Sequence, residues 1–257
     1  MNIIKKILLG NTSLEVSRIG LGTVKFGRNT GVKYPNSFNI PDDHSIRLLL
    51  NLAKELNINL LDTAPAYGDS EERLGKLLKS DRHDWIISTK VGEEFENNQS
   101  VFNFTKEYII NSVQRSLKRL NTDYLDILLI HSNGDDEEII NKFEVFDSLA
   151  ALKQQGLIRS FGMSCKTIVG GLLTVKMADV AMVTYNPNYL DEISVIVEAY
   201  KLNKGILIKK AFNSGYINPK QAIDVIAKTP GVHSIIIGTI NLLHLKENVQ
   251  CFSDLTN

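Results

Sequence analysis

The chain of 257 residues has little cysteine: Cys165 and Cys251 are the only two, and neither lies in a CxxC pair or another metal-ligand spacing. This scarcity argues against a disulfide framework, so we expect two buried or inert thiols. Long hydrophobic runs are also missing, since none approaches the ~18 residues that a membrane-spanning helix needs. Neither charge sign is in excess, because lysine plus arginine and aspartate plus glutamate number 29 each. The composition therefore predicts a soluble, cytoplasmic protein that binds neither nucleic acid nor membrane.

Metal-ligand patterns and domain boundaries are absent as well. Four histidines form no HxxxH or similar arrangement, so we expect surface or packing positions for them and no metal site. These histidines are His44, His83, His233 and His244. No segment is of low complexity, and no boundary is rich in proline, glycine and serine, so one domain over residues 1–257 is the simplest prediction. The least patterned stretches, 28–41 and 93–104, are expected to be elaborated loops.

The spacing of apolar residues indicates strands that alternate with helices. After a hairpin-like opening around Gly10 and Asn11, a first strand is expected at Gly20–Thr23. Later strands are expected to end near Asp62, Lys90, His131, Gly162, Thr184, Lys209 and Gly238. Helical spacing covers residues 42–57, 69–79, 105–120, 137–155, 165–177, 191–203, 218–228 and 241–250. About eight strand–helix units predict an α/β fold, a closed (β/α)8 TIM barrel, with an open doubly wound sheet as the alternative.

Four polar residues fall where apolar, strand-like runs give way to polar loops. Asp62 and Tyr67 lie in "LLDTAPAYGDSEERLG", Lys90 lies in "WIISTKVG", and His131 lies in "LDILLIHSN". In a parallel barrel the carboxyl ends of the strands face the active site. These side chains are therefore expected to converge at one mouth of the barrel.

A phenol beside an ammonium and an imidazole suits protonation of a carbonyl oxygen. Lys90 would lower the pKa of Tyr67 by favouring the phenolate, and Asp62 would supply the counter-charge of Lys90. His131 would hydrogen-bond the substrate oxygen or relay the proton. This interpretation makes Tyr67 the general acid. Taken singly, each of these residues is more often a cap, a rim residue or a solvated charge.

Several motifs together resemble the aldo-keto reductase family: the opening "VSRIGLGT", the run "LDTAPAYG" with its following "RLG", "STKVG", "LDILLIH", and the closing "SIIIGT" and "LKENV". They occur in the family's order along nearly the whole chain. The resemblance implies a (β/α)8 barrel whose bottom is closed by an N-terminal β-hairpin. It also implies binding of NADP(H) or NAD(H) without a Rossmann fold, and a catalytic tetrad of Asp62, Tyr67, Lys90 and His131.

The resemblance further suggests a path for the dinucleotide along the mouth of the barrel. The implied cofactor-binding residues are Gly22, Thr23, Asp62, Ser164, Lys209, Lys210, Ser214, Gly215, Gly238, Thr239, Asn241, Glu247 and Asn248. Residues 22–23 would lie beside the nicotinamide ribose, 209–215 near the pyrophosphate and 238–248 near the adenosine. Without the resemblance, "GTINLLHLKEN" is a plain strand–turn–helix with Asn241 as its cap.

This chain departs from the family pattern around the nicotinamide. Cys165 replaces the usual asparagine, Met182 the usual glutamine, and Lys209 the usual stacking aromatic. Gly238 and His244 stand where basic residues commonly bind the 2′-phosphate. Because two lysines, at 209 and 210, favour an anionic cofactor, NADPH is the first expectation and NADH the second.

Three functions are compatible with these residues. The first is reduction of a small aldehyde or ketone by NADPH or NADH. The second is a dinucleotide-binding regulatory or interaction module with little turnover, and the third is a barrel hydrolase or lyase that needs no nicotinamide. Val24, Phe26 and Asn133 are candidate pocket residues, the first two being equally compatible with ordinary packing.

Overall fold

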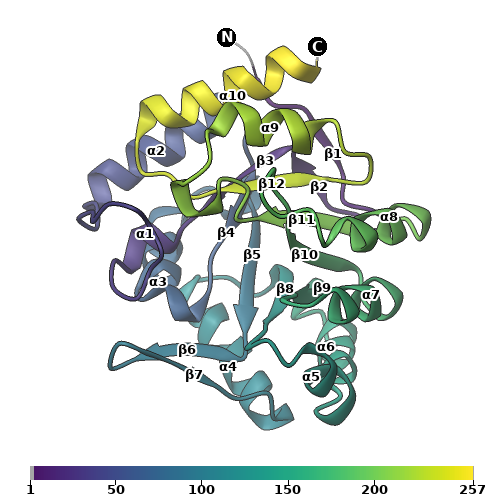
Figure 1. The fold of residues 1–257 in the computed structure, drawn as a ribbon. Coiled ribbons are helices and arrows are strands. Elements are labelled where there is room, and N and C mark those ends of the chain that lie inside the picture. The colour runs from purple at the N-terminus through teal and green to yellow at the C-terminus, as the bar shows by residue number, and fades with distance from the viewer. Residues whose placement is uncertain (1–2, 257) are drawn as a thin grey trace.

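Eight parallel strands close into a barrel in the order β10-β11-β12-β3-β4-β5-β8-β9 (Figure 1). The structure is a computed structural model that describes residues 3–256. The barrel strands are β3 (Ile19–Gly22), β4 (Leu60–Asp62), β5 (Ile86–Val91), β8 (Leu125–His131), β9 (Ile158–Ser164), β10 (Val180–Thr184), β11 (Gly205–Lys209) and β12 (Ser234–Ile237). The predicted (β/α)8 barrel is thus confirmed, and the open doubly wound sheet is wrong.

Helices surround the barrel because each buries an apolar stripe against the strands. In α2, for example, Leu49, Leu50 and Ala53 are buried, and the Asp42 side chain caps the first turn by accepting from Ser45 N at 2.8 Å. The α-helices are α1 (Val24–Gly27), α2 (Asp43–Glu55), α3 (Ser70–Leu77), α4 (Lys106–Arg119), α5 (Asp136–Lys142), α6 (Val145–Gln154), α7 (Ile168–Met177), α8 (Ile193–Lys201), α9 (Pro219–Ala227) and α10 (Leu242–Thr256). Short 3-10 helices are η1 (Pro65–Tyr67), η2 (Arg82–Asp84) and η3 (Asn213–Gly215).

The N-terminal hairpin of β1 (Lys6–Leu8) and β2 (Glu15–Ser17) closes the bottom of the barrel. Leu9, Leu14 and Val16 are buried in one cluster with interior residues of the strands, among them Leu60 and Leu207. This packing fills the end of the barrel opposite the carboxyl ends of the strands. The predicted hairpin closure is therefore confirmed.

Two sequence predictions about elements are wrong. The expected loop 93–104 contains an antiparallel hairpin of β6 (Glu93–Glu96) and β7 (Gln99–Phe102). Its turn is Asn97–Asn98, with φ angles of 49° and 62°, a left-handed conformation that asparagine tolerates. The single helix expected over 137–155 is two helices, because Glu144 has a φ of 48° and separates α5 from α6. The break allows apolar residues on both sides of it to be buried.

Other features of residues 3–256 concern cysteine, histidine and the membrane. Cys165 is buried and Cys251 is half-buried, and both are free thiols. The His233 ring lies against the Gly10 amide of the N-terminal hairpin, with 3.0 Å between the nitrogens, whereas the other three histidines outside the candidate tetrad are exposed. In this part of the chain no helix is both long and apolar enough to span a bilayer, and no three metal-ligating side chains are grouped.

Candidate active site

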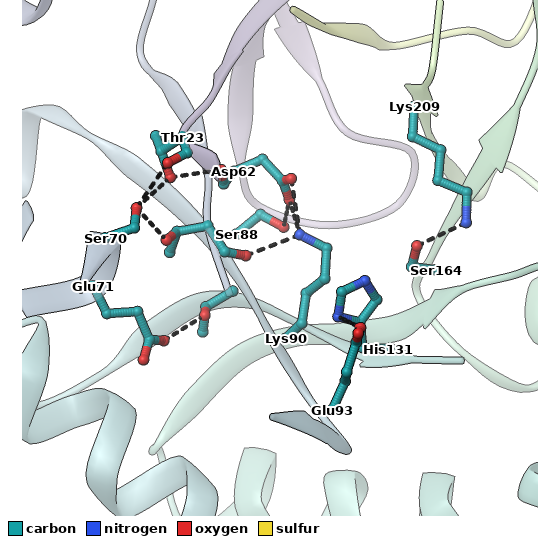
Figure 2. Close-up of polar contacts among 12 residues, drawn as sticks. Thr23, Asp62, Ser70, Glu71, Ser88, Lys90, Glu93, His131, Ser164 and Lys209 are labelled. Carbon is teal, nitrogen blue, oxygen red and sulfur yellow. Dashed lines mark hydrogen bonds and ion pairs between the residues drawn. The ribbon is translucent and has the colours of Figure 1, made fainter. Parts of the chain in front are cut away.

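The four residues predicted to converge do meet at the mouth formed by the carboxyl ends of the strands. Asp62 and His131 are the last residues of β4 and β8, and Lys90 is the last but one of β5. Tyr67 ends η1, the turn that directly follows β4. Figure 2 shows Asp62, Lys90 and His131 side by side above the barrel strands.

Lys90 and Asp62 form a buried ion pair. Lys90 Nζ lies 2.8 Å from both carboxylate oxygens of Asp62 and donates to the carbonyl of Thr63 at 2.9 Å. Ser88 Oγ donates to the same carboxylate at 3.0 Å. Burial by itself lowers the pKa of Lys90, but the charges of Asp62 and Tyr67 and their hydrogen bonds outweigh it, so the net pKa is raised. The ammonium therefore stays charged although Lys90 is only 1% exposed.

Tyr67 lies against both Lys90 and His131. Lys90 Nζ is 4.8 Å from the centroid of the Tyr67 ring, and the His131 ring meets it edge to face at 6.1 Å. Burial raises the pKa of Tyr67, and the charge of Lys90 and its hydrogen bond lower it. Burial prevails, so the net pKa is raised, and the predicted net lowering is wrong. The phenol accordingly keeps its proton at neutral pH and can donate it.

His131 has a partner that the sequence reasoning missed. Its Nδ1 lies 2.7 Å from Oε2 of Glu93, the first residue of the β6–β7 hairpin (Figure 2). Ser100 Oγ donates to the other carboxylate oxygen of Glu93 at 2.5 Å. Burial raises the pKa of Glu93, but His131 and Ser100 more than offset this and hold it at about 2. Burial lowers the pKa of His131 by more than the contact with Glu93 raises it, so the net pKa is lowered. The alternation in "EEFENNQSVF" around Asn97–Asn98 was the signal for this hairpin.

On the other side of the mouth, half-buried Lys209 makes its direct contacts with neutral groups. Its Nζ donates to Ser164 Oγ at 2.9 Å and to the Cys165 carbonyl at 2.5 Å. Among residues 3–256 it has no ion-pair partner of the kind that Asp62 provides for Lys90. Burial lowers the pKa of Lys209 to about 8 and raises that of nearby Glu192 to about 7.

Two of the residues that depart from the family pattern turn away from the mouth. The thiol of Cys165 is buried and lies 3.5 Å from Thr174 Oγ1 of α7. Met182 is buried inside the barrel with Leu9 and Leu207. Neither side chain is placed to hold a ligand at the mouth.

The candidate ribose and adenosine residues are largely engaged within the protein. Thr23 is fully buried, and its hydroxyl donates to the Asp62 carbonyl at 3.0 Å. Asn241 Oδ1 accepts from the amides of residues 243 and 244 at 2.8 and 3.3 Å and so caps α10, as the plain strand–turn–helix interpretation requires. Further along this helix Glu247 is exposed and Asn248 is buried, and Gly22 is buried in β3.

The loop after β11 carries positive charge close to the mouth. Lys210 is exposed with a φ of 53°, and its pKa is lowered first by burial and then by the charges of Lys33 and Lys166. The charges of Lys33 and Lys166 thus reach Lys210, and Glu192 offsets them only in part, so a bound polyphosphate would fit this local positive charge.

Loop 28–41 lies across this part of the mouth. Its Pro35 Cδ is 3.3 Å from the position that a Cβ would take at Gly215, and Tyr34 Oη is 3.0 Å from that position at Gly238. The half-buried Ser214, with a φ of 60°, precedes Gly215 in η3, and the buried Thr239 follows Gly238. The candidate pyrophosphate and adenosine segments therefore both lie against this loop.

The three candidate pocket residues differ in their surroundings. Phe26 is fully buried in the core, and Val24 is half-buried in α1. Asn133 lines a cavity of about 270 Å³ between the end of β7 and the loop after β8. This cavity adjoins the His131 strand, but none of the four tetrad side chains lines it.

The protein is thus a TIM barrel with a buried lysine–aspartate pair, a phenol and an imidazole gathered at its mouth. The chain belongs to the aldo/keto reductase family, whose family model matches residues 18–208. It superimposes on the crystal structure of PA4992 from Pseudomonas aeruginosa with a TM-score of 0.93 and 47% identity, covering 100% of this chain and 98% of that one.

Two curated relatives extend the comparison. The uncharacterized oxidoreductase YqkF of Bacillus subtilis is 27% identical over 96% of this chain and 90% of its own length. The NADH-specific methylglyoxal reductase of Escherichia coli is 35% identical, over 62% of this chain and 51% of that protein. Membership of the aldo/keto reductase family and the similarity to these oxidoreductases together support nicotinamide-dependent carbonyl reduction in general terms.

Proposed function

We propose that this protein, as one barrel domain, reduces a small aldehyde or ketone to the alcohol, with Tyr67 as the general acid. The observation that carries the proposal is the buried Lys90–Asp62 pair beside the Tyr67 ring, at the mouth where His131 also lies. A buried ion pair of this kind is costly to build and fixes the charge next to the phenol. That arrangement suits stabilisation of negative charge as it develops on a carbonyl oxygen.

Each residue of the tetrad has a distinct part in the proposal. Tyr67 holds a proton at neutral pH and gives it to the carbonyl oxygen, leaving a phenolate that the Lys90 ammonium stabilises. Asp62 keeps Lys90 charged and in place through two contacts of 2.8 Å. His131 hydrogen-bonds the same oxygen and orients the carbonyl. A nicotinamide dinucleotide, when bound, supplies the hydride.

The dinucleotide is proposed to be held by this chain's own cationic and loop residues. Lys33, Lys166 and Lys210 fit its phosphates, since the charges of the first two act on the third and Glu192 offsets them only in part. Ser164 and Lys209, which are hydrogen-bonded to each other, would be the polar groups that hold the nicotinamide end. We propose NADPH ahead of NADH because of this concentration of positive charge.

Replacement of Tyr67 by phenylalanine tests the proposal. Loss of a general acid lowers turnover by about 10²- to 10⁴-fold, and we expect this loss in NADPH-dependent reduction of a carbonyl panel by Tyr67→Phe. Fluorescence titration with NADPH should show that dinucleotide binding survives. Tyr200→Phe, the same change on an exposed ring of α8, is the matched control. Full turnover by Tyr67→Phe would exclude Tyr67 as the acid.

A second candidate function is a dinucleotide-binding module with little turnover. It is favoured by the nicotinamide side of the mouth, where Cys165 and Met182 face away and Lys209 replaces an aromatic ring. Tight NADPH binding without reduction of any carbonyl in the same panel would support it over the reductase.

A further inference from the structure

The β6–β7 hairpin is docked against the turn that carries Tyr67. The Arg28 guanidinium donates to the Ala66 carbonyl at 3.0 Å and stacks on the Phe95 ring at 3.3 Å. Arg28 thus joins the residue before Tyr67 to the middle of β6. This contact fixes Glu93, at the start of β6, relative to the acid–base residues.

The contact between Glu93 and His131 restricts where the imidazole can carry its proton. Nδ1 and Oε2 are 2.7 Å apart, but the oxygen lies off the direction of the ring N–H, so this is an ion-pair contact rather than an in-line hydrogen bond. At that distance an unprotonated Nδ1 and a carboxylate oxygen are two acceptor atoms that repel one another at any angle, whereas a protonated Nδ1 attracts the carboxylate charge. Glu93 is ionised over the neutral range, since its pKa is about 2. Nδ1 must therefore be the protonated nitrogen.

We propose that Glu93 is a positioning residue that keeps a proton on Nδ1 of His131, so that Nε2 is a hydrogen-bond donor only when the ring is an imidazolium. The inference rests on the proposed function, in which His131 contacts the substrate oxygen. A neutral ring with Nδ1–H presents a lone pair at Nε2, which repels a carbonyl oxygen and accepts from an alcohol hydroxyl. Carbonyl reduction is thus favoured by the imidazolium, and alcohol oxidation by the neutral ring.

The charges around the pair come from several elements. Lys90 from β5 and Lys209 from β11 both oppose protonation of His131, whereas Glu93 favours it. Tyr67 meets the ring edge to face from η1. Lys166, which follows β9, and Arg28 act on Glu93 itself. Glu93 is the one anion among these residues that lies in direct contact with the imidazole.

The proton position can be measured without any turnover. Nitrogen-15 NMR of histidine side chains distinguishes Nδ1–H, Nε2–H and imidazolium forms, and the loss of one signal in His131→Asn assigns residue 131 among the five histidines. In the unsubstituted protein we expect the Nδ1–H tautomer above the titration midpoint of His131. An Nε2–H tautomer there would overturn the proposal, whatever the outcome for Tyr67→Phe.

Glu93→Gln tests the charge of the carboxylate while keeping its size. Removing an opposite charge in contact with the ring should lower the His131 titration midpoint by about 1–2 pH units. The alkaline limb of kcat/KM for carbonyl reduction should move to lower pH by the same amount. Glu94→Gln, the next residue of β6, is the matched control, because its carboxylate contacts Arg115 and Tyr108 instead.

The two readouts separate the inference from the proposed function. A lowered midpoint together with a displaced limb in Glu93→Gln, and neither in Glu94→Gln, supports the proposal. An unchanged His131 titration midpoint in Glu93→Gln overturns the proposal. A lowered midpoint also overturns it if the variant is active and the alkaline limb of its kcat/KM profile does not move. If neither the unsubstituted protein nor any variant reduces a carbonyl, the proposed function fails, and the role of Glu93 in catalysis fails with it. The NMR measurement would still report which nitrogen of His131 carries the proton.

Discussion

Buried Lys90 and half-buried Lys209 occupy opposite sides of the same barrel mouth, and their pKa values are shifted in opposite directions. Lys90 contacts the Asp62 carboxylate at 2.8 Å, and its pKa is raised. Lys209 donates to a hydroxyl and a backbone carbonyl, and burial lowers its pKa to about 8. The barrel, the strand-end position and the residue type are the same in both cases. A direct carboxylate contact is what decides whether a buried ammonium is stabilised.

The comparison separates a fixed side of the mouth from a more adaptable side. Around Lys90, an ion pair and hydrogen bonds hold the Asp62 carboxylate, which also accepts from Ser88. Around Lys209, the positive charge lacks a direct counter-ion, and a ligand with an anionic or strongly polar group would improve its environment. We therefore expect the chemistry to depend on the first side and ligand selection on the second.

The largest expected effect comes from Lys90→Met. Removing one partner leaves the carboxylate of Asp62 buried and unpaired, which typically costs about 3–5 kcal/mol. The free energy of unfolding in urea should fall by an amount of this order, and carbonyl reduction should be lost. A variant as stable as the unsubstituted protein would show that the ion pair does not hold this side of the mouth together.

Lys209→Met should behave in the opposite way. The pKa of Lys209 is about 8 in the folded protein and 10.5 when exposed, so its charged form disfavours folding. That penalty is complete below pH 8 and is relieved as the pH rises from about 8 to 10.5. The stability advantage of Lys209→Met should therefore shrink over this range in urea titrations.

Lys90→Met serves as the control for that pH series. Because the pKa of Lys90 is raised in the folded state, its contribution to stability persists up to pH 10.5 and declines only above it. If the stability difference caused by Lys209→Met were constant from pH 8 to 10.5, the contrast between the two lysines would be wrong.

The smallest expected effect concerns Cys165, whose thiol should resist alkylation in the native protein. Burial raises the pKa of Cys165 to about 12, and its side chain lies against α7 rather than at the mouth. Iodoacetamide should label the half-buried Cys251 first in the native protein and reach Cys165 only on unfolding, as mass spectrometry of digests can show. NADPH binding should be unchanged after the first label. Rapid native labelling of Cys165 would place its thiol at the mouth after all.

The comparison also shows which parts of the site were accessible from the sequence. Asp62, Lys90 and His131 could be located because apolar runs end at them, and parallel strands bring their carboxyl ends to one mouth. Glu93 could not be assigned a partner in this way, since its place depends on how a hairpin packs against η1. The orientation of Cys165 could not be predicted either, because the residue type at position 165 does not show which way its side chain points after the end of β9.

The sequence by itself determined the alternation of strands and helices and the polar residues at the strand ends, because hydrophobic periodicity is a local property of the chain. The family resemblance added the expectation of a hairpin beneath the barrel, and the structure decided between a closed barrel and an open sheet. Only the tertiary structure decided the direction of each pKa shift. The pKa of Tyr67 is raised although Lys90 is beside it, since burial contributes more than one neighbouring charge. Such a balance depends on distances of a few ångströms and on exclusion of water, which exist only once distant segments have packed together.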